Sequence, residues 1–251
     1  MKHSAMKVAL FIPCYVDQFY PQVGIATLEL LEKQGVEVHF PTDQTCCGQP
    51  MANSGCEDQG QETAKLFVEN FKDYDYIVGP TGSCVLHVRE HFNKIPQTEA
   101  VKKVRAKTYE LCEFLTDVLK VHSFDVSFPY KVGLHLSCHG QRGMRMAQSS
   151  ELVGQDFSKM RSLLAMVKDI QLIDLDRKDE CCGFGGTFAV AEEAVSVKMG
   201  KDRIADHKKN GAQVLTGGDM SCLMHMEGII KRKKEDVKVM HIAEILNGKT
   251  V

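Results

Sequence analysis

The cysteines are the residues of this sequence best suited to chemistry. The chain of 251 residues contains ten. Eight fall into two sets, each with a single cysteine, then an adjacent pair, then another single cysteine. The sets are Cys14, Cys46, Cys47 and Cys84, followed by Cys138, Cys181, Cys182 and Cys222. Four thiolates in one place can hold a metal ion or an iron–sulfur cluster. We therefore expect one metal centre for each set.

The adjacent pairs indicate the kind of centre. Neighbouring Cα atoms lie about 3.8 Å apart, below the usual separation of about 4.4 to 6.8 Å in a disulfide. Zinc more often takes ligands that are about two to four residues apart, whereas a larger cluster accepts ligands from adjacent residues. Gly48 and Gly183 follow the pairs and let backbone N–H groups approach the sulfurs. We favour iron–sulfur clusters, with a zinc-binding or thiol-redox module as the alternative.

The segments around the cysteines repeat in the same order. The matching segments are 7–14 with 131–138, 45–48 with 180–183, and 78–84 with 216–222. Three matches in one order indicate a tandem duplication, with its seam near residues 123–130. We predict two domains, 1–125 and 126–251.

Each half alternates short apolar runs with amphipathic segments, which is the pattern of a parallel sheet covered by helices. Strands are predicted over 8–12, 36–40, 76–79 and 107–110, and over 132–136, 170–174, 213–217 and 237–240. Helices are predicted over 22–34, 59–71, 85–92 and 111–120, and over 157–168, 189–210, 222–233 and 242–246. The predicted fold class is therefore α/β, with two pseudo-symmetric Rossmann-like repeats. Each set of cysteines follows strand ends that share one edge of a sheet, so its four thiols should converge.

Charge and hydropathy exclude several classes of function. The chain has 31 basic and 33 acidic residues and a formal charge of −2, which gives no field for binding nucleic acid. No apolar run approaches the roughly 20 residues of a spanning helix, and the first residues lead into a strand rather than a signal peptide. We expect a cytoplasmic protein without a membrane span. In that reducing compartment, thiols serve as metal ligands or redox groups more often than as disulfides.

Five further residues lie near the two sets or outside the repeat. Cys56 and Cys112 have no counterparts in the other half, and we interpret them as buried packing thiols, with the rim of the first centre as an alternative place for Cys56. His139 and His225 are the histidines best placed to bind iron or donate a proton, although a structural role is the simpler interpretation. Asp219 is expected to cap a helix, with a weak oxygen ligand as the alternative. The sequence identifies no catalytic residue.

The repeated Cys…Cys-Cys-Gly…Cys motif resembles that of the CCG, or cysteine-rich, domain family over nearly the whole chain. Residues 81–84 and 218–225 are most similar to the lactate-utilisation protein A branch, which is related to heterodisulfide reductase and to the glycolate oxidase iron–sulfur subunit. The resemblance implies an iron–sulfur electron-transfer subunit of a complex that oxidises L-lactate to pyruvate. It also implies two partner proteins, one of them a ferredoxin-type iron–sulfur protein.

One departure from the heterodisulfide reductase branch bears on the cofactor. In that branch each repeat ends in Cys-x-x-Cys, but Thr81 and Asp219 stand at the first of these cysteines here. Four thiols per repeat favour one conventional [4Fe–4S] cluster in each, or a labile cluster, and make heterodisulfide-reductase-like chemistry the weaker alternative. The same departure leaves open that one repeat has lost its cluster.

Overall fold

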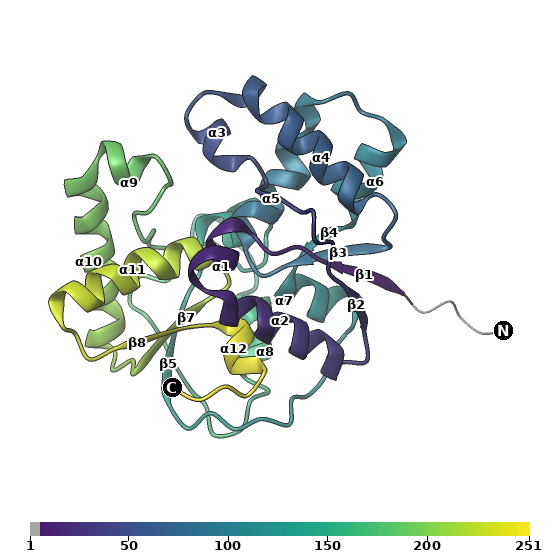
Figure 1. The fold of residues 1–251 in the computed structure, drawn as a ribbon. Coiled ribbons are helices and arrows are strands. Elements are labelled where there is room, and N and C mark those ends of the chain that lie inside the picture. The colour runs from purple at the N-terminus through teal and green to yellow at the C-terminus, as the bar shows by residue number, and fades with distance from the viewer. Residues whose placement is uncertain (1–5) are drawn as a thin grey trace. The chain divides into compact units, whose positions relative to one another are not determined.

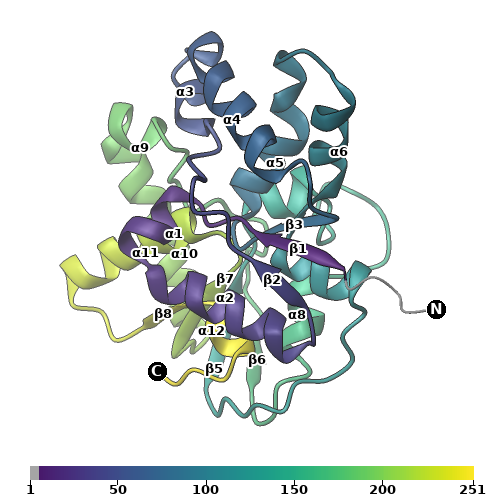
Figure 2. The same cartoon turned by 45° about the vertical axis from the view of Figure 1, so that its right-hand side comes forward.

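The computed structural model describes residues 6–251. The chain divides between Leu119 and Lys120 into two compact units, each built on a four-stranded parallel sheet (Figure 1 and Figure 2). The strand orders are β2-β1-β3-β4 and β6-β5-β7-β8, so the two sheets have the same topology. The predicted α/β fold with two tandem repeats is confirmed.

The first unit has helices on both faces of its sheet. Its strands are β1 (Lys7–Leu10), β2 (Glu37–His39), β3 (Tyr76–Gly79) and β4 (Thr108–Glu110). Its α-helices are α1 (Cys14–Phe19), α2 (Pro21–Lys33), α3 (Gln49–Asn53), α4 (Gln61–Phe71), α5 (Gly82–His91), α6 (Glu99–Lys107) and α7 (Leu111–Glu113). Short 3-10 turns cover Glu57–Gly60 and Phe92–Lys94, and a π turn covers Phe114–Val118. Helices α4 and α6 lie on one face, and α2 and α7 on the other (Figure 1).

The second unit repeats this plan. Its strands are β5 (Lys131–His135), β6 (Gln171–Ile173), β7 (Val214–Gly217) and β8 (Lys238–His241). Its helices are α8 (Lys159–Leu164), α9 (Phe188–Ala191), α10 (Glu193–Lys209), α11 (Met220–Lys233) and α12 (Ile242–Leu246), with a π turn over His139–Gly143. Helix α10 packs against α11, and α8 packs against α12. Among residues 6–251, no helix combines the length and the apolar character that crossing a lipid bilayer requires.

The sequence predicts strands better than helix ends. All eight predicted strands are present, because their apolar runs are buried between helices on both faces of a sheet. The predicted helix over 189–210 is interrupted at Glu192, whose backbone (φ −123°, ψ 48°) separates α9 from α10. The predicted helix over 157–168 is shortened to α8, which begins after Ser158. Ser158 Oγ accepts the Arg161 N–H and caps the helix there.

A buried acid at the start of α7 makes the stability of the first unit depend on pH. Glu110 is fully buried, and its Oε2 accepts hydrogen bonds from the backbone N–H groups of Cys112 (2.6 Å) and Glu113 (3.1 Å). Burial raises the pKa of Glu110 from 4.5 to about 8. The native state therefore holds the proton more tightly than the unfolded state. The resulting stability is fully present below pH about 4.5 and is lost as the pH rises to about 8.

Glu110→Gln tests this dependence, because glutamine stays neutral at every pH. We expect the stability of the variant relative to the native chain to increase between pH 5 and pH 8, by up to roughly 4 kcal/mol. Urea unfolding at four pH values across this range measures the difference. A difference that does not change with pH would show that Glu110 ionises normally in the folded protein.

Candidate metal centres

In the first unit, three loops at the carboxyl edge of the sheet bring four thiols together. Cys14 begins α1 after β1, Cys46 and Cys47 follow β2, and Cys84 lies in the first turn of α5 after β3. The Sγ atoms of Cys14 and Cys46 are 3.8 Å apart. The Cys47 thiol is in hydrogen-bond contact with those of Cys46 and Cys84. The four sulfurs therefore form one connected cluster.

The second unit has the same arrangement. Cys138 follows β5, the pair Cys181 and Cys182 follows β6, and Cys222 lies in the first turn of α11 after β7. Cys181 is in hydrogen-bond contact with Cys138 and with Cys182. Cys182 is in turn in contact with Cys222. Two sets of residues that share a motif thus form two clusters of four thiols.

Each cluster has a buried inner side and an outer side that reaches solvent. Cys47 and Cys182 are each 2% exposed, whereas Cys138 is exposed and Cys14 is partly so. In the first unit, Cys47 belongs to a buried core that includes Phe11. A group held by these thiols would be shielded on its inner side and reachable by a partner on its outer side.

Backbone N–H groups point at the sulfurs, as the glycines after each pair predict. The N–H of Gly48 lies 3.4 Å from Cys46 Sγ, and that of Gly183 lies 3.3 Å from Cys181 Sγ. Both glycines have positive φ angles, +90° and +89°. The Phe184 N–H adds a contact of 3.5 Å to Cys182 Sγ. These donors favour the charged, thiolate form of the sulfur.

The thiols also shift each other's pKa. The pKa of Cys46 is lowered to about 2, first by a hydrogen bond from Cys14, with the Cys47 thiol and the Gly48 N–H contributing. The pKa of Cys181 is lowered to about 2 in the same way, with Cys138 as the main donor. The pKa of Cys14 is raised, because its own proton is held by Cys46. Each cluster therefore stabilises one thiolate, a soft donor that suits a cation of matching softness.

The close approach at Gly183 gives a prediction for stability. A Cβ atom added there would lie 2.6 Å from the Ser196 carbonyl oxygen and 2.7 Å from Met199 Cβ. We expect Gly183→Ala to lower the free energy of unfolding by about 3 kcal/mol, through backbone strain and this contact together. Gly211→Ala is the matched control, because Gly211 has a φ of +83° but no atom within 4 Å of its added Cβ. It should lose only about 1 kcal/mol in the same denaturation experiment; equal losses would contradict the close-approach explanation.

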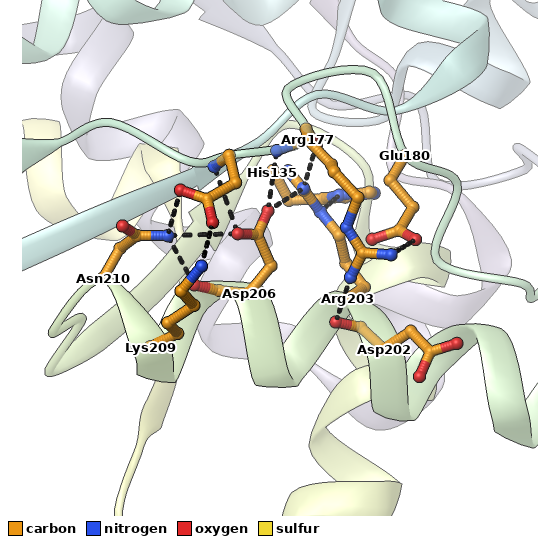
Figure 3. Close-up of polar contacts among 9 residues, drawn as sticks. His135, Arg177, Glu180, Asp202, Arg203, Asp206, Lys209 and Asn210 are labelled. Atoms are coloured by element: carbon orange, nitrogen blue, oxygen red, sulfur yellow. Dashed lines mark hydrogen bonds and ion pairs between the residues drawn. The ribbon is translucent and has the colours of Figure 1, made fainter.

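Corresponding helix residues hold the loops that carry the cysteine pairs. In the first unit, Asn70 Nδ2 on α4 donates to the carbonyl oxygen of Asp43 at 2.8 Å. In the second, Asp206 on α10 accepts from the backbone N–H groups of Asp176 and Arg177, both at 3.1 Å. Figure 3 shows Asp206 between this loop and the side chain of Arg203. Asn70 and Asp206 thus fix each loop a few residues before its cysteine pair.

The two remaining cysteines lie apart from these contacts. Cys112 is fully buried in α7, as expected of a packing thiol. Cys56 is only partly buried, and its Sγ lies 3.7 Å from the Ser54 carbonyl oxygen. Asp219 does occupy the N-cap position of α11, but its carboxylate makes no capping bond to the helix and accepts a hydrogen bond from Ser221 Oγ at 2.8 Å. Asp219 therefore lies at the predicted N-cap position, but its side chain does not make the predicted capping hydrogen bond.

Histidines lie near both clusters, and only some of them are predicted from the sequence. His139 Nδ1 lies 3.8 Å from Cys138 Sγ, and His225 Nε2 lies 3.3 Å from the Ser196 carbonyl oxygen. His87, at the position corresponding to His225, is buried and acts electrostatically on Cys46. Aligning the two repeats around the last cysteine of each would have found it. His135 is also absent from the predicted residues, although it has a ring nitrogen close to two of the thiols.

The same two regions match a family model. The model is that of the CCG cysteine-rich domain, and it matches residues 8–89 and 132–227. The chain belongs to the cysteine-rich domain family. The two matched regions of this cysteine-rich domain protein contain all eight clustered cysteines.

Named relatives and a solved structure extend the comparison. The chain is 44% identical to Lactate utilization protein A of Halalkalibacterium halodurans, over 96% of this chain and 97% of that protein. It is 43% identical to Lactate utilization protein A of Bacillus subtilis, over 97% of this chain and 100% of that protein. A hypothetical protein from Helicobacter pylori shares the fold, with a TM-score of 0.58 and 13% identity, over 97% of this chain and 49% of that protein.

Proposed function

We propose that the chain is an iron–sulfur electron-transfer subunit of a cytoplasmic L-lactate-oxidising system, with one [4Fe–4S] cluster in each unit. The observation that carries this proposal is the connected set of four thiols at the carboxyl edge of each sheet. Its connection with lactate is supported by relatives named Lactate utilization protein A that cover nearly the whole chain. When bound, such clusters accept and release single electrons.

The residues present suit this group. Four thiolates form a soft donor set, which selects iron–sulfur clusters or zinc over hard cations. Cys47 and Cys182 would hold a cluster from the buried side. The N–H groups of Gly48 and Gly183 would stabilise the charge that accumulates on sulfur.

Two clusters would suit the electron count of the proposed reaction. Oxidation of L-lactate to pyruvate releases two electrons and two protons, and two one-electron centres can together accept both electrons. The exposed side of each thiol cluster, at Cys14 and Cys138, gives a place at which electrons can enter or leave. We propose two partner proteins, one of them a ferredoxin-type iron–sulfur protein that exchanges electrons there.

Zinc is the second candidate, and one distance favours it. The separation of 3.8 Å between the Sγ atoms of Cys14 and Cys46 is close to the edge of a tetrahedron with Zn–S bonds of about 2.3 Å. In that case the chain would be a metal-stabilised or thiol-redox module, and it would carry no electrons through iron.

Metal analysis separates the two candidates. After anaerobic purification of the full chain, we expect about eight iron and about eight acid-labile sulfide per chain, with an electron paramagnetic resonance (EPR) signal after reduction. In the complex isolated with its partners, adding L-lactate should produce the same signal, and adding D-lactate provides the control. Stoichiometric zinc without sulfide would overturn the iron–sulfur proposal, and clusters that L-lactate does not reduce would overturn the role in lactate oxidation.

A further inference from the structure

The two units differ in the residues that lie beneath their thiols. In the first unit, the ring of Phe11, just after β1, meets the rings of Phe67 and Phe71 of α4 edge to face, at centroid distances of 4.9 and 6.0 Å. In the second unit, the corresponding positions hold His135, Arg203 and His207. All three are buried. An aromatic cluster in one repeat is therefore replaced by a buried polar cluster in the other.

The contact with Arg203 decides which ring nitrogen of His135 carries hydrogen. Arg203 Nε lies 3.1 Å from His135 Nδ1 (Figure 3). A guanidinium group only donates hydrogen bonds, so Nδ1 must be the acceptor. An accepting Nδ1 carries no hydrogen, whereas a protonated imidazole carries hydrogen on both nitrogens, so the ring of His135 is neutral. A neutral ring that accepts at Nδ1 carries its hydrogen on Nε2.

Two sulfur acceptors lie close to the ring of His135. His135 is 2% exposed, and within residues 6–251 its Nε2 has no hydrogen-bond partner in the protein. A ring nitrogen of His135 and the Sγ atoms of Cys182 and Cys222 all lie within 4.8 Å of one another. Because Nε2 bears hydrogen, it has no lone pair for a metal, and donation to sulfur is the interaction left to it.

We propose that His135 Nε2–H donates a hydrogen bond to the sulfurs of the second centre and thereby raises the reduction potential of that centre. This inference rests on the proposed iron–sulfur function. Hydrogen bonds to sulfur stabilise the more negative, reduced state. Phe11 offers no donor at the corresponding position of the first unit. Arg203 is a positioning residue, since its bond to Nδ1 fixes the tautomer.

Other residues near the thiols show why this donor matters. His87 and His225 occupy corresponding positions in the two units, so they do not distinguish the centres. Asp219, however, stands where the first unit has Thr81, and its carboxylate acts on Cys138 and Cys222 as a nearby negative charge. The carboxylate of Asp219 therefore lowers the reduction potential of the second centre, and the His135 donor opposes it.

Replacing His135 tests the inference. In a Cys46→Ser background, only the second centre should be observed in an EPR-monitored redox titration of the anaerobically reconstituted full chain. We expect His135→Phe to lower the reduction equilibrium constant about tenfold, a shift of about 59 mV for one electron. His135→Gln, which restores a donor, should recover most of the shift. His207→Phe, a matched replacement of another buried imidazole, should leave the potential unchanged.

The outcomes distinguish the two proposals. An unchanged reduction potential in the His135→Phe variant would overturn the hydrogen-bond inference but not the proposed function. An equal shift of the potential in the His207→Phe variant would do the same. Absence of iron and sulfide from the native chain would overturn the proposed function and this inference with it. If His135→Phe fails to fold, nitrogen-15 NMR of the metal-free native chain decides instead. Hydrogen on Nε2 is expected, and hydrogen on Nδ1 would overturn the inference.

Discussion

Replacing Cys46 with serine is expected to remove about four of about eight iron atoms per chain, and Cys181→Ser should remove the other four. Each of these cysteines is in contact with two neighbouring thiols of its cluster. Serine offers a harder oxygen, which is a poor substitute for thiolate in an iron–sulfur site. Because the thiols of each unit come from one sheet, the loss should be confined to the altered unit. Iron and sulfide analysis and the EPR spectrum of each variant measure the loss.

Cys56→Ser is the control for a general effect of cysteine replacement. The Cys56 thiol is partly exposed and lies against the Ser54 carbonyl, so we expect the full iron content in this variant. Loss of iron would instead place Cys56 at the rim of the first centre. In cells that depend on this chain for lactate oxidation, Cys46→Ser and Cys181→Ser should each abolish growth on L-lactate. Growth that survives both replacements would show that the clusters are not needed for the reaction.

The sequence is informative about the fold because the strand signal is strong. Buried parallel strands favour near-continuous apolar runs, such as residues 8–12, and these stand out between polar helices. The ends of helices depend on weaker local effects. Nothing in the residues around Glu192 signals an interruption, because neither glycine nor proline occurs between Phe188 and Met199. Tertiary packing decides the break there.

The site was only partly predictable for a related reason. The eight cysteines are visible because type and spacing repeat, and strand ends at one edge of a sheet bring them together. His135 carries no such signal, since a single histidine at the position that corresponds to Phe11 resembles an ordinary core substitution. Its chemistry depends on Arg203, which lies 68 residues away and holds Nδ1. Only the folded structure brings these two residues together.

Asp206→Ala should lower the free energy of unfolding of the second unit by about 3 to 5 kcal/mol, the loss expected when one partner of a buried ion pair is removed. Arg203 is 0% exposed, and its Nη1 lies 3.2 Å from Asp206 Oδ2. Without this carboxylate, the buried guanidinium loses its ion-pair partner, and the N–H groups of Asp176 and Arg177 lose their acceptor. Urea unfolding measures the loss, and hydrogen exchange locates it in the loop before Cys181.

Asn70→Ala is the matched control for Asp206→Ala, because it changes the corresponding residue of the first unit. It removes one hydrogen bond, from Nδ2 to the Asp43 carbonyl oxygen, and no ion pair. The expected loss is about 1 kcal/mol. Equal losses in the two variants would contradict the role of Asp206 as the counter-ion of Arg203.

A combined replacement separates stability from redox tuning. His135→Phe, Arg203→Phe and His207→Phe, together with Asp206→Asn, would give the second unit the four residues found at the corresponding positions of the first. A buried ion pair is often no more stabilising than apolar residues that pack equally well. We therefore expect this variant to unfold at a urea concentration close to that of the native chain. Its second centre should nevertheless keep the lowered potential of His135→Phe, because the Nε2 donor is absent. Stability retained with a lowered potential would mean that the polar cluster serves the redox centre rather than the fold.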